Sequence, residues 1–214
     1  MSVQRLTAVG LLLCSLCQAI CGMVGIDNGD MTNGMITPTG DTIPYGWGST
    51  ACHGTAPSTV CIYYDQQEYV SPPASMRIEG AGDPHVFAHG VYDLEYVHGY
   101  ILWAAGMAKV ADVSGVFHVW LRSACGGTGW VYVDSTHLVE ATSDSGWFFF
   151  KGALPIPRPA LCESFGLETP AMVVHVSWAG TGQAWIDDVL VSTDEPGIPA
   201  VKRDKGAAAN HCGI

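Results

Sequence analysis

The segment AWIDDVLVS, residues 184–192, decides the fold, because its apolar and β-branched residues predict a strand near the end of the chain. Asp187 and Asp188 stand side by side within it, where the core and the hydrogen-bonding ladder both favour apolar residues. Such a pair indicates a position that faces solvent, caps a neighbouring turn or binds a partner that offsets its charge.

Segments of similar character precede this strand and are separated by Gly, Pro, Ser and Asp. The chain contains 26 glycines and 12 prolines, spread among Val, Thr, Tyr and Trp, which favours short strands joined by turns over long helices. The other expected strands lie at 74–80, 85–97, 99–108, 115–122, 129–134, 146–151 and 171–178. Strands at this spacing predict an all-β fold, an antiparallel β-sandwich or jelly roll.

Length and charge limit the function further. A chain of 214 residues with 48% hydrophobic residues is long enough for one domain with its own core. It carries 9 basic and 20 acidic residues, which gives a net charge of −11 at pH 7. This charge disfavours nucleic acid, anionic membrane surfaces and polyanionic substrates as partners. Neutral ligands and cations are easier partners.

Residues 1–22 predict a secretory signal peptide. They contain a cation at Arg5, an apolar run from Leu6 to Leu16 and small residues that suit signal-peptidase cleavage. The run is too short to span a bilayer comfortably, so we expect no membrane insertion. Cleavage would leave a secreted protein with a β-sandwich over 23–192 and an extended, partly mobile tail over 193–214.

The cysteines fit an oxidising compartment, where disulfides are favoured over metal-thiolate sites. Cleavage after Ala19 would leave an even number of them, which are Cys21, Cys52, Cys61, Cys125, Cys162 and Cys212. We expect Cys52 with Cys61, Cys125 with Cys162, and Cys21 with Cys212. Six cysteines allow many other connectivities, so these pairings are hypotheses.

Six short motifs follow one another in a specific order. They are DNGDMTNG at 27–34, IPYGWG at 43–48, ASMRIEG at 74–80, GYILWAAGMA at 99–108, GWFFFKGALPIP at 146–157 and AWIDDVLV at 184–191. Their order resembles that of the carbohydrate-binding modules of families 4, 9, 16 and 22, which share a galactose-binding-like jelly roll. The resemblance extends over roughly residues 26–192 and implies a protein that binds polysaccharides.

The resemblance also implies a structural calcium ion where the first and last strands meet. Carried over by position, its ligands would be Thr32 and Asp187, with Asp30 and Asp188 nearby. Calcium prefers oxygen ligands, including hydroxyl and carbonyl oxygens where carboxylates are few. A divalent ion would also offset the cost of placing a carboxylate within a sheet.

Period-2 alternation then sorts the strand residues onto two faces. In GYILWAAGMA the family pattern places Tyr100, Leu102, Ala104 and Gly106 in the core, and Ile101, Trp103, Ala105 and Met107 on the other face. In GVFHVWLR, residues 115–122, the apolar set Phe117, Val119 and Leu121 turns inward. His118, Trp120 and Arg122 therefore share the opposite face.

Indole rings on an open sheet face need a cover, and the apolar face of a pyranose ring would provide one. The expected carbohydrate-binding residues are Trp103, His118, Trp120 and Arg122, extended by Tyr132 and His175. Large aromatic residues of β-sandwiches also serve in the core or at edges, and a bulge would change the face of any of them. We assign Trp47 and Trp185 to structure and leave Trp130, Trp147 and Trp178 open.

The sequence thus predicts a secreted, non-catalytic protein that binds a neutral or weakly charged polysaccharide on a concave sheet face, alone or within a larger extracellular assembly. One alternative is a lyase-like enzyme in which His118, Tyr132, Arg122 and His175 supply the base and the cation. A second alternative is an extracellular structural or protein-interaction jelly roll. His85 and His89 alternate onto one face as a possible zinc pair, although solvated or structural histidines fit them better.

Overall fold

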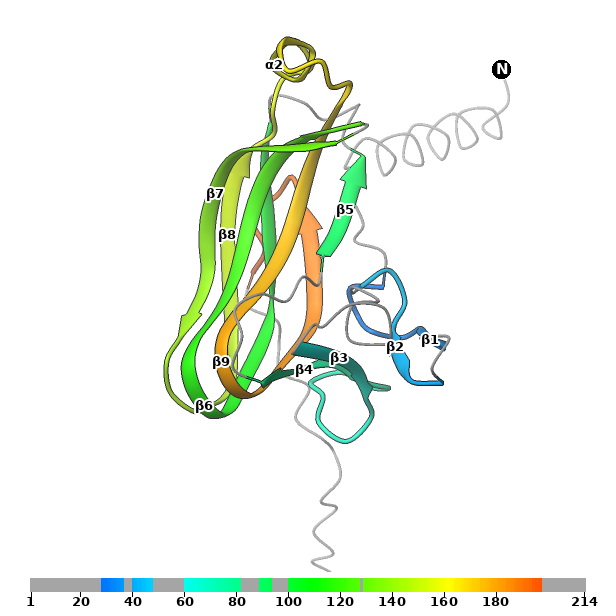
Figure 1. Cartoon of the computed structure of the whole chain (residues 1–214), viewed down its shortest axis with the longest axis vertical. Coiled ribbons are helices and arrows are strands. Elements are labelled where there is room, and N and C mark those ends of the chain that lie inside the picture. Colours follow the sequence, from blue (N-terminus) through cyan, green and yellow to red (C-terminus); the bar gives the residue numbers. More distant parts are fainter. Residues whose placement is uncertain are drawn as a thin grey trace, which may run out of the picture.

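The computed structural model describes residues 28–36, 40–47, 60–81, 89–93, 100–127 and 129–197. These residues form nine strands and one short helix (Figure 1), which confirms the all-β expectation. The strands are β1 Gly34–Ile36, β2 Thr42–Pro44, β3 Val60–Asp65, β4 Ser75–Ala81, β5 His89–Asp93, β6 Ile101–Gly126, β7 Trp130–Ala141, β8 Ser145–Pro155 and β9 Thr169–Ser192. The helix is α2 Pro159–Ser164. Within the described residues, no helix is long and apolar enough to cross a membrane.

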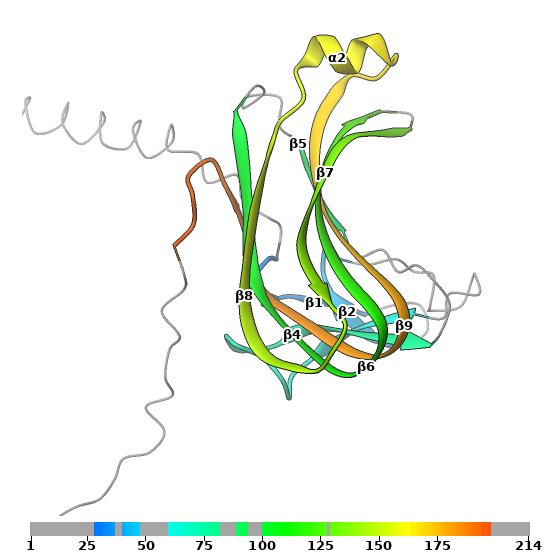
Figure 2. The ribbon, with the colours of Figure 1, turned by 90° about the vertical axis from the view of Figure 1, so that its left-hand side faces the viewer.

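Two long strands, β6 and β9, run through both sheets of the sandwich. The first part of β6 pairs with β8 and its last part pairs with β7. β9 lies antiparallel to β6 along nearly its whole length. Figure 2 shows both strands bending back at one end of the molecule, so that β8 and β7 stand in opposite arms.

The two arms are the two layers of a jelly-roll sandwich. The first sheet has the order β3–β4–β9–β6–β8, and the second sheet has the order β5–β9–β6–β7. All these pairs are antiparallel, and β1 and β2 form a separate two-stranded sheet. Each sheet therefore has one face towards its partner and one face turned away from it.

The core fills the space between the two sheets. Leu102 and Ala104 of the first sheet and Val119 and Leu121 of the second belong to one fully buried cluster. Within the same cluster, the rings of Phe117 and Trp178 meet edge to face with centroids 5.2 Å apart. The inward positions predicted for residues 117, 119 and 121 are therefore confirmed. Trp47 and Trp185 are also buried, as the structural role assigned to them requires.

Glycines at the bend allow β6 and β9 to approach closely. Gly180 and Gly182 both have positive φ, at +154° and +123°. A Cβ atom on Gly180 would lie 1.6 Å from the carbonyl oxygen of Ser114, and one on Gly182 would lie 2.5 Å from that of Asp112. Only residues without a side chain fit these two positions.

The same bend explains where the predicted strand boundaries were wrong. Segments 99–108 and 115–122 are one continuous strand, as are 171–178 and 184–192. Gly, Ser and Asp between them bend the strands instead of ending them, through bulges such as the register shift between Ala111 and Ser114. Tyr100, predicted to lie in the core, precedes β6 and is 63% exposed. The sequence also missed β1, β2, β3 and the helix.

A disulfide joins Cys125 at the end of β6 to Cys162 in α2. Leu167 belongs to the same buried cluster as these two cysteines. This bond confirms one of the three expected pairings. The other two fall on Cys21, Cys52 and Cys212, which lie outside the described residues, and on Cys61, whose side chain is not described.

Candidate functional site

The outward-turned face of the second sheet, called the outer face below, collects most of the predicted site residues. It carries His118, Trp120 and Arg122 from β6, since these alternate with the buried Val119 and Leu121. His175 of β9 is the cross-strand partner of Trp120, and Tyr132 of β7 pairs with Ala124. In Figure 2 the ribbons of this sheet bow towards the opposite arm at mid-length, so the outer face curves inward.

Trp120 lies at the centre of this face and is held on several sides. The imidazole ring of His137 packs against it with centroids 3.4 Å apart, and the Arg122 guanidinium lies 5.2 Å from its centroid. The indole Nε1–H donates a hydrogen bond to Ser177 Oγ at 3.2 Å. Trp120 is therefore half-buried among protein groups and leaves little of its ring face free for a ligand.

The rings that remain open lie further along the sheet. Tyr132 is 47% exposed, with the Arg122 guanidinium 4.9 Å from its ring centroid and the His175 ring 6.5 Å away. Trp130 is 49% exposed. Its six-membered ring packs over Gly126, where an added Cβ would lie 2.9 Å from two ring carbons. Tyr132 and Trp130 thus form the exposed aromatic part of the outer face.

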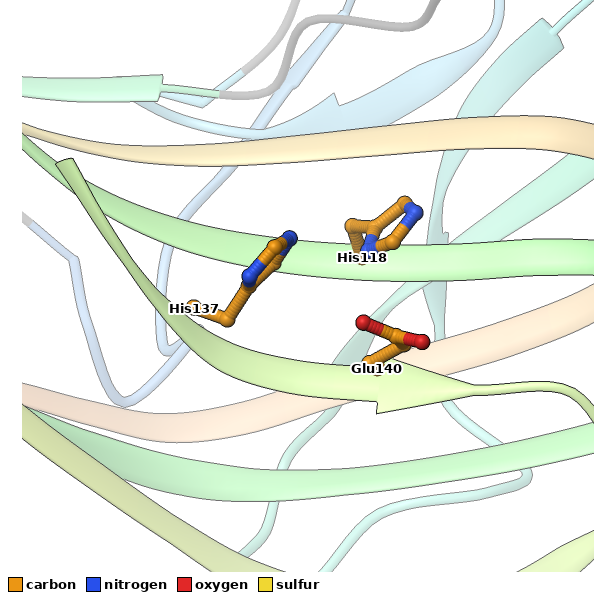
Figure 3. Close-up of side chains that lie close together, drawn as sticks. All are labelled: His118, His137 and Glu140. Atoms are coloured by element: carbon orange, nitrogen blue, oxygen red, sulfur yellow. The ribbon is translucent and has the colours of Figure 1, made fainter.

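A compact group of titratable side chains adjoins Trp120 at the other end of the face. Figure 3 shows His118, His137 and Glu140 projecting together from β6 and β7. Their nearest ligating atoms all lie within 4.8 Å of one another. Burial lowers the pKa of His118, and His137 lowers it further, while Glu140 opposes the shift. His118 is therefore held towards its neutral form.

Trp103 does not join this group. It alternates with the buried Leu102 and Ala104 of the first sheet, so it lies on that sheet's outward side. There the Lys151 ammonium group lies 5.7 Å from its ring centroid. The bend of β6 turns Trp103 and Trp120 in opposite directions, so the single platform expected for both is not formed.

Asp187 of β9 is the cross-strand partner of Met107 of β6, and Asp188 and Val189 form the bulge opposite Gly106. Asp187 is fully buried and accepts hydrogen bonds from the backbone N–H groups of Val70 (2.7 Å), Ser71 (3.0 Å) and Asp188 (2.7 Å). Asp188 has a positive φ of 49° and accepts a hydrogen bond from the Ser71 hydroxyl. The two carboxylates thus cap the turn that begins at Val70 and hold it against the closing strand.

Burial raises the pKa of Asp187 to about 6, and the charge of Asp188 also raises it, against the opposing effect of the three backbone hydrogen bonds. Among the other predicted calcium ligands, Asp30 accepts hydrogen bonds from the backbone and hydroxyl of Thr32. Val189 N–H donates to the carbonyl oxygen of Gly29, so the opening turn does meet the closing strand. Because Asp187 points to N–H donors, it fits a hydrogen-bonding role, and calcium binding stays a prediction.

The sequence did not identify His137, Glu140 and Trp130 as members of the outer face. β7 has register shifts against β6 at Val119/Trp120 and at Ser123/Ala124. Each shift inserts a residue, so simple alternation from Tyr132 places His137 on the wrong face, and the second shift brings Glu140 back into phase. For Trp130 the available signal was Gly126, a residue small enough to lie beneath an indole ring. Of the two histidines that the sequence analysis weighed as a zinc pair, His85 lies outside the described residues and the His89 side chain is not described.

Comparison with known proteins supports the fold. No protein-family model and no curated protein matches the chain. A candidate sugar-binding protein from Bacteroides thetaiotaomicron VPI-5482 is 12% identical, with a TM-score of 0.51 over 81% of this chain and 100% of that one. The enzymatically active domain of tailspike protein 4 from bacteriophage CBA120 is 12% identical, with a TM-score of 0.52 over 79% of this chain and 21% of that one.

Modules of carbohydrate-binding families 4 and 22 are also among the similar structures. The CBM22-1 xylan-binding domain of Xyn10C from Paenibacillus barcinonensis is 13% identical, with a TM-score of 0.44 over 70% of this chain and 86% of that one. At such identities the comparison carries no ligand or activity over to this chain.

Proposed function

We propose that this chain is a secreted, non-catalytic protein that binds a neutral or weakly charged polysaccharide on the outer face of its second sheet. One observation carries the proposal, namely that the exposed rings of Trp130 and Tyr132 lie on one curved face, where Tyr132 adjoins Arg122 and His175. Exposed aromatic groups that gather on a surface commonly mark a site where a ligand or partner binds.

The residues of this face suit a sugar polymer. The C–H face of a pyranose ring packs on an exposed aromatic ring, and Trp130 and Tyr132 provide two such rings. Arg122 offers up to five N–H donors and imidazoles offer a donor and an acceptor, which suits hydroxyl groups around the sugar. Trp120 has a supporting role here, because its ring holds Arg122 and His137 in position. The net charge of −11 disfavours polyanionic polymers.

Affinity gel electrophoresis through soluble glucans, xylans, mannans and uronates tests this proposal. The variants are Trp130→Ala and Tyr132→Ala on the outer face, with Trp103→Ala on the first sheet as the matched control. We expect retardation by a neutral polymer, weakened in the two outer-face variants and unchanged in the control. Thermal unfolding of each variant checks that the fold is retained.

Two results would count against the proposal. If Trp103→Ala weakens retardation and the two outer-face variants do not, the ligand binds on the other sheet. If no polymer retards the chain, this class of ligand is rejected, and the exposed rings are better explained by a protein partner.

The absence of catalysis is part of the proposal. A glycoside hydrolase of the usual kind needs two carboxyl groups on either side of the bound sugar bond. In the described part of the outer face, Glu140 is the carboxylate that clusters with the site residues, and it lies beside His118 and His137. Incubation of the chain with each retarding polymer should release neither reducing ends nor unsaturated products. Product formation that Tyr132→Phe abolishes would instead establish the lyase-like alternative.

Secretion rests on the character of residues 1–22 and on the Cys125–Cys162 disulfide, since such bonds persist mainly in oxidising compartments. Expression of the full-length chain in a secreting host tests it, with N-terminal sequencing of the exported protein. If the chain is found only inside the cells, and only in its uncleaved form, the proposal of secretion is refuted.

Calcium binding by Asp30, Thr32, Asp187 and Asp188 is a separate proposal, supported by the hydrogen bond that joins the opening turn to the closing strand. Thermal unfolding in calcium and in a chelator tests it. A melting temperature that rises with calcium concentration supports the site. Equal melting temperatures would show that the two aspartates act only as hydrogen-bond acceptors.

A further inference from the structure

We propose that His118, His137 and Glu140 form a binding site for a divalent first-row transition metal ion such as Zn²⁺. The site lies on the outer face, next to Trp120, and goes beyond the polysaccharide-binding function proposed above. Among the described residues, these three are the group of His, Cys, Asp or Glu side chains whose ligating atoms come within 4.8 Å of one another.

The backbone brings the three donors together from two neighbouring strands. Glu140 of β7 is the cross-strand partner of His118 of β6. His137 reaches the same side because a register shift lies between it and Glu140. The two imidazole rings have centroids 5.0 Å apart, and Figure 3 shows the Glu140 carboxylate beside them.

Two further observations indicate that the donors are prepared for a ligand. His137 packs against the indole ring of Trp120, with centroids 3.4 Å apart, which restricts the orientation of its imidazole. His118 Nδ1 is buried and has no hydrogen-bond partner among the described residues. A buried nitrogen without a partner is costly, and a metal ion bound to it would remove that cost.

The donor set selects the class of ion. Two imidazoles and one carboxylate suit Zn²⁺ and related ions, whereas Ca²⁺ and Mg²⁺ prefer oxygen ligands. A tetrahedral zinc ion holds its donors about 3.4 Å apart, so these side chains must close by roughly 1 Å. Glu140 is exposed and can make most of this adjustment, while the packed His137 ring stays in place. Three protein ligands leave the fourth position open to water or to a ligand group.

Isothermal titration with ZnCl₂ tests the site in the oxidised full-length chain, without a polyhistidine tag. The variants are His118→Asn, His137→Asn and Glu140→Gln. Glu163→Gln on α2 is the matched control, because it makes the same exchange at an exposed position outside the cluster. CaCl₂ and MgCl₂ are titrated in parallel. The measurement contains no polysaccharide, so its failure leaves the proposed binding function untouched.

We expect about one zinc ion per chain at this site, with affinity lowered at least about tenfold in each of the three variants and unchanged in Glu163→Gln. Glu140→Gln preserves the size of an exposed side chain, so loss of zinc binding in this variant, with cooperative unfolding retained, reports on the ligand itself. The proposal is overturned if the chain binds no zinc, or if zinc binds equally well to the His118→Asn and His137→Asn variants.

Discussion

At the scale of single residues, Gly126 determines how much of Trp130 is available to a ligand. The indole ring packs over the glycine, and a Cβ atom there would lie 2.9 Å from two of its carbons. Half of the Trp130 surface nevertheless stays exposed. The glycine thus supports one side of the ring and leaves the rest accessible.

Gly126→Ala should therefore move Trp130 away from its position on the sheet. We expect polysaccharide affinity to fall roughly three- to tenfold, because a well-placed aromatic contact contributes about 1 kcal/mol. Retardation in affinity gels measures this loss. Gly129→Ala is the control, since a Cβ there meets no atom within 4 Å. Equal losses in both variants would contradict the role given to the Trp130 position.

Asp187 makes stability depend on pH in a definite direction. Its pKa is about 6 in the folded chain and 3.8 for the ordinary group, so the folded state holds the proton more tightly. The contribution of Asp187 to stability is therefore present below about pH 4 and is lost as the pH rises to about 6. The full loss is on the order of 3 kcal/mol.

Urea unfolding of the wild type and of Asp187→Asn, from pH 4 to pH 7, measures this contribution. Carboxylates remote from Asp187 have the same surroundings in both proteins, so the difference between the two free energies of unfolding reports on Asp187 and its coupling to Asp188. We expect the wild type to lose stability relative to the variant as the pH rises. A difference that does not change with pH would show that the three backbone hydrogen bonds fully offset the burial.

At the scale of secondary-structure elements, the bends of β6 and β9 depend on glycines with no room for a side chain. Gly180→Ala places a Cβ against the backbone of Ser114. We expect a loss of about 4 kcal/mol or more in the free energy of unfolding, because the backbone on both strands must move. Denaturant unfolding measures it, with Gly146→Ala of β8 as a control whose Cβ meets nothing within 4 Å. Similar stability of the two variants would contradict this account.

The sequence predicted elements well where the ladder is regular. From Phe117 to Arg122 the alternation gave the correct faces, because β6 pairs there with β9 without interruption. On β7 the first bulge changes the phase of alternation and places His137 on the unexpected face, whereas the second bulge restores the phase at Glu140. Bulges depend on which strands pair and in which register, and a single strand's sequence does not contain that information.

At the scale of the whole molecule, the Cys125–Cys162 disulfide closes a loop with a sequence separation of 37 residues. Removing it with Cys125→Ser/Cys162→Ser should lower the free energy of unfolding by about 4 kcal/mol, chiefly through the greater freedom of the unfolded chain. Urea unfolding under oxidising conditions measures the change. If the free energy of unfolding of this variant lies within about 1 kcal/mol of the wild-type value, the disulfide adds little to the stability that the packing of Leu167 against residues 125 and 162 provides.

The sequence indicated the overall architecture better than it indicated the site. The order of the six motifs predicted the jelly roll, because strand patterns and turn residues depend on nearby residues and can therefore be identified in the sequence. The site depends on which strands become neighbours and on which side of the sandwich each residue lies. Trp103 and Trp120 both suit a sugar platform from their sequence context, and only the bend of β6 separates them.

The sharing of β6 and β9 between the two sheets also governs how the domain comes apart. In a sandwich whose layers are joined only by loops, one layer can open while the other persists. Here both layers contain the same two strands, so opening either one disturbs the other. Slowly exchanging amide protons of both arms should therefore share one opening free energy. A single protease cut near residue 113 would divide β6 between the two layers and weaken both at once.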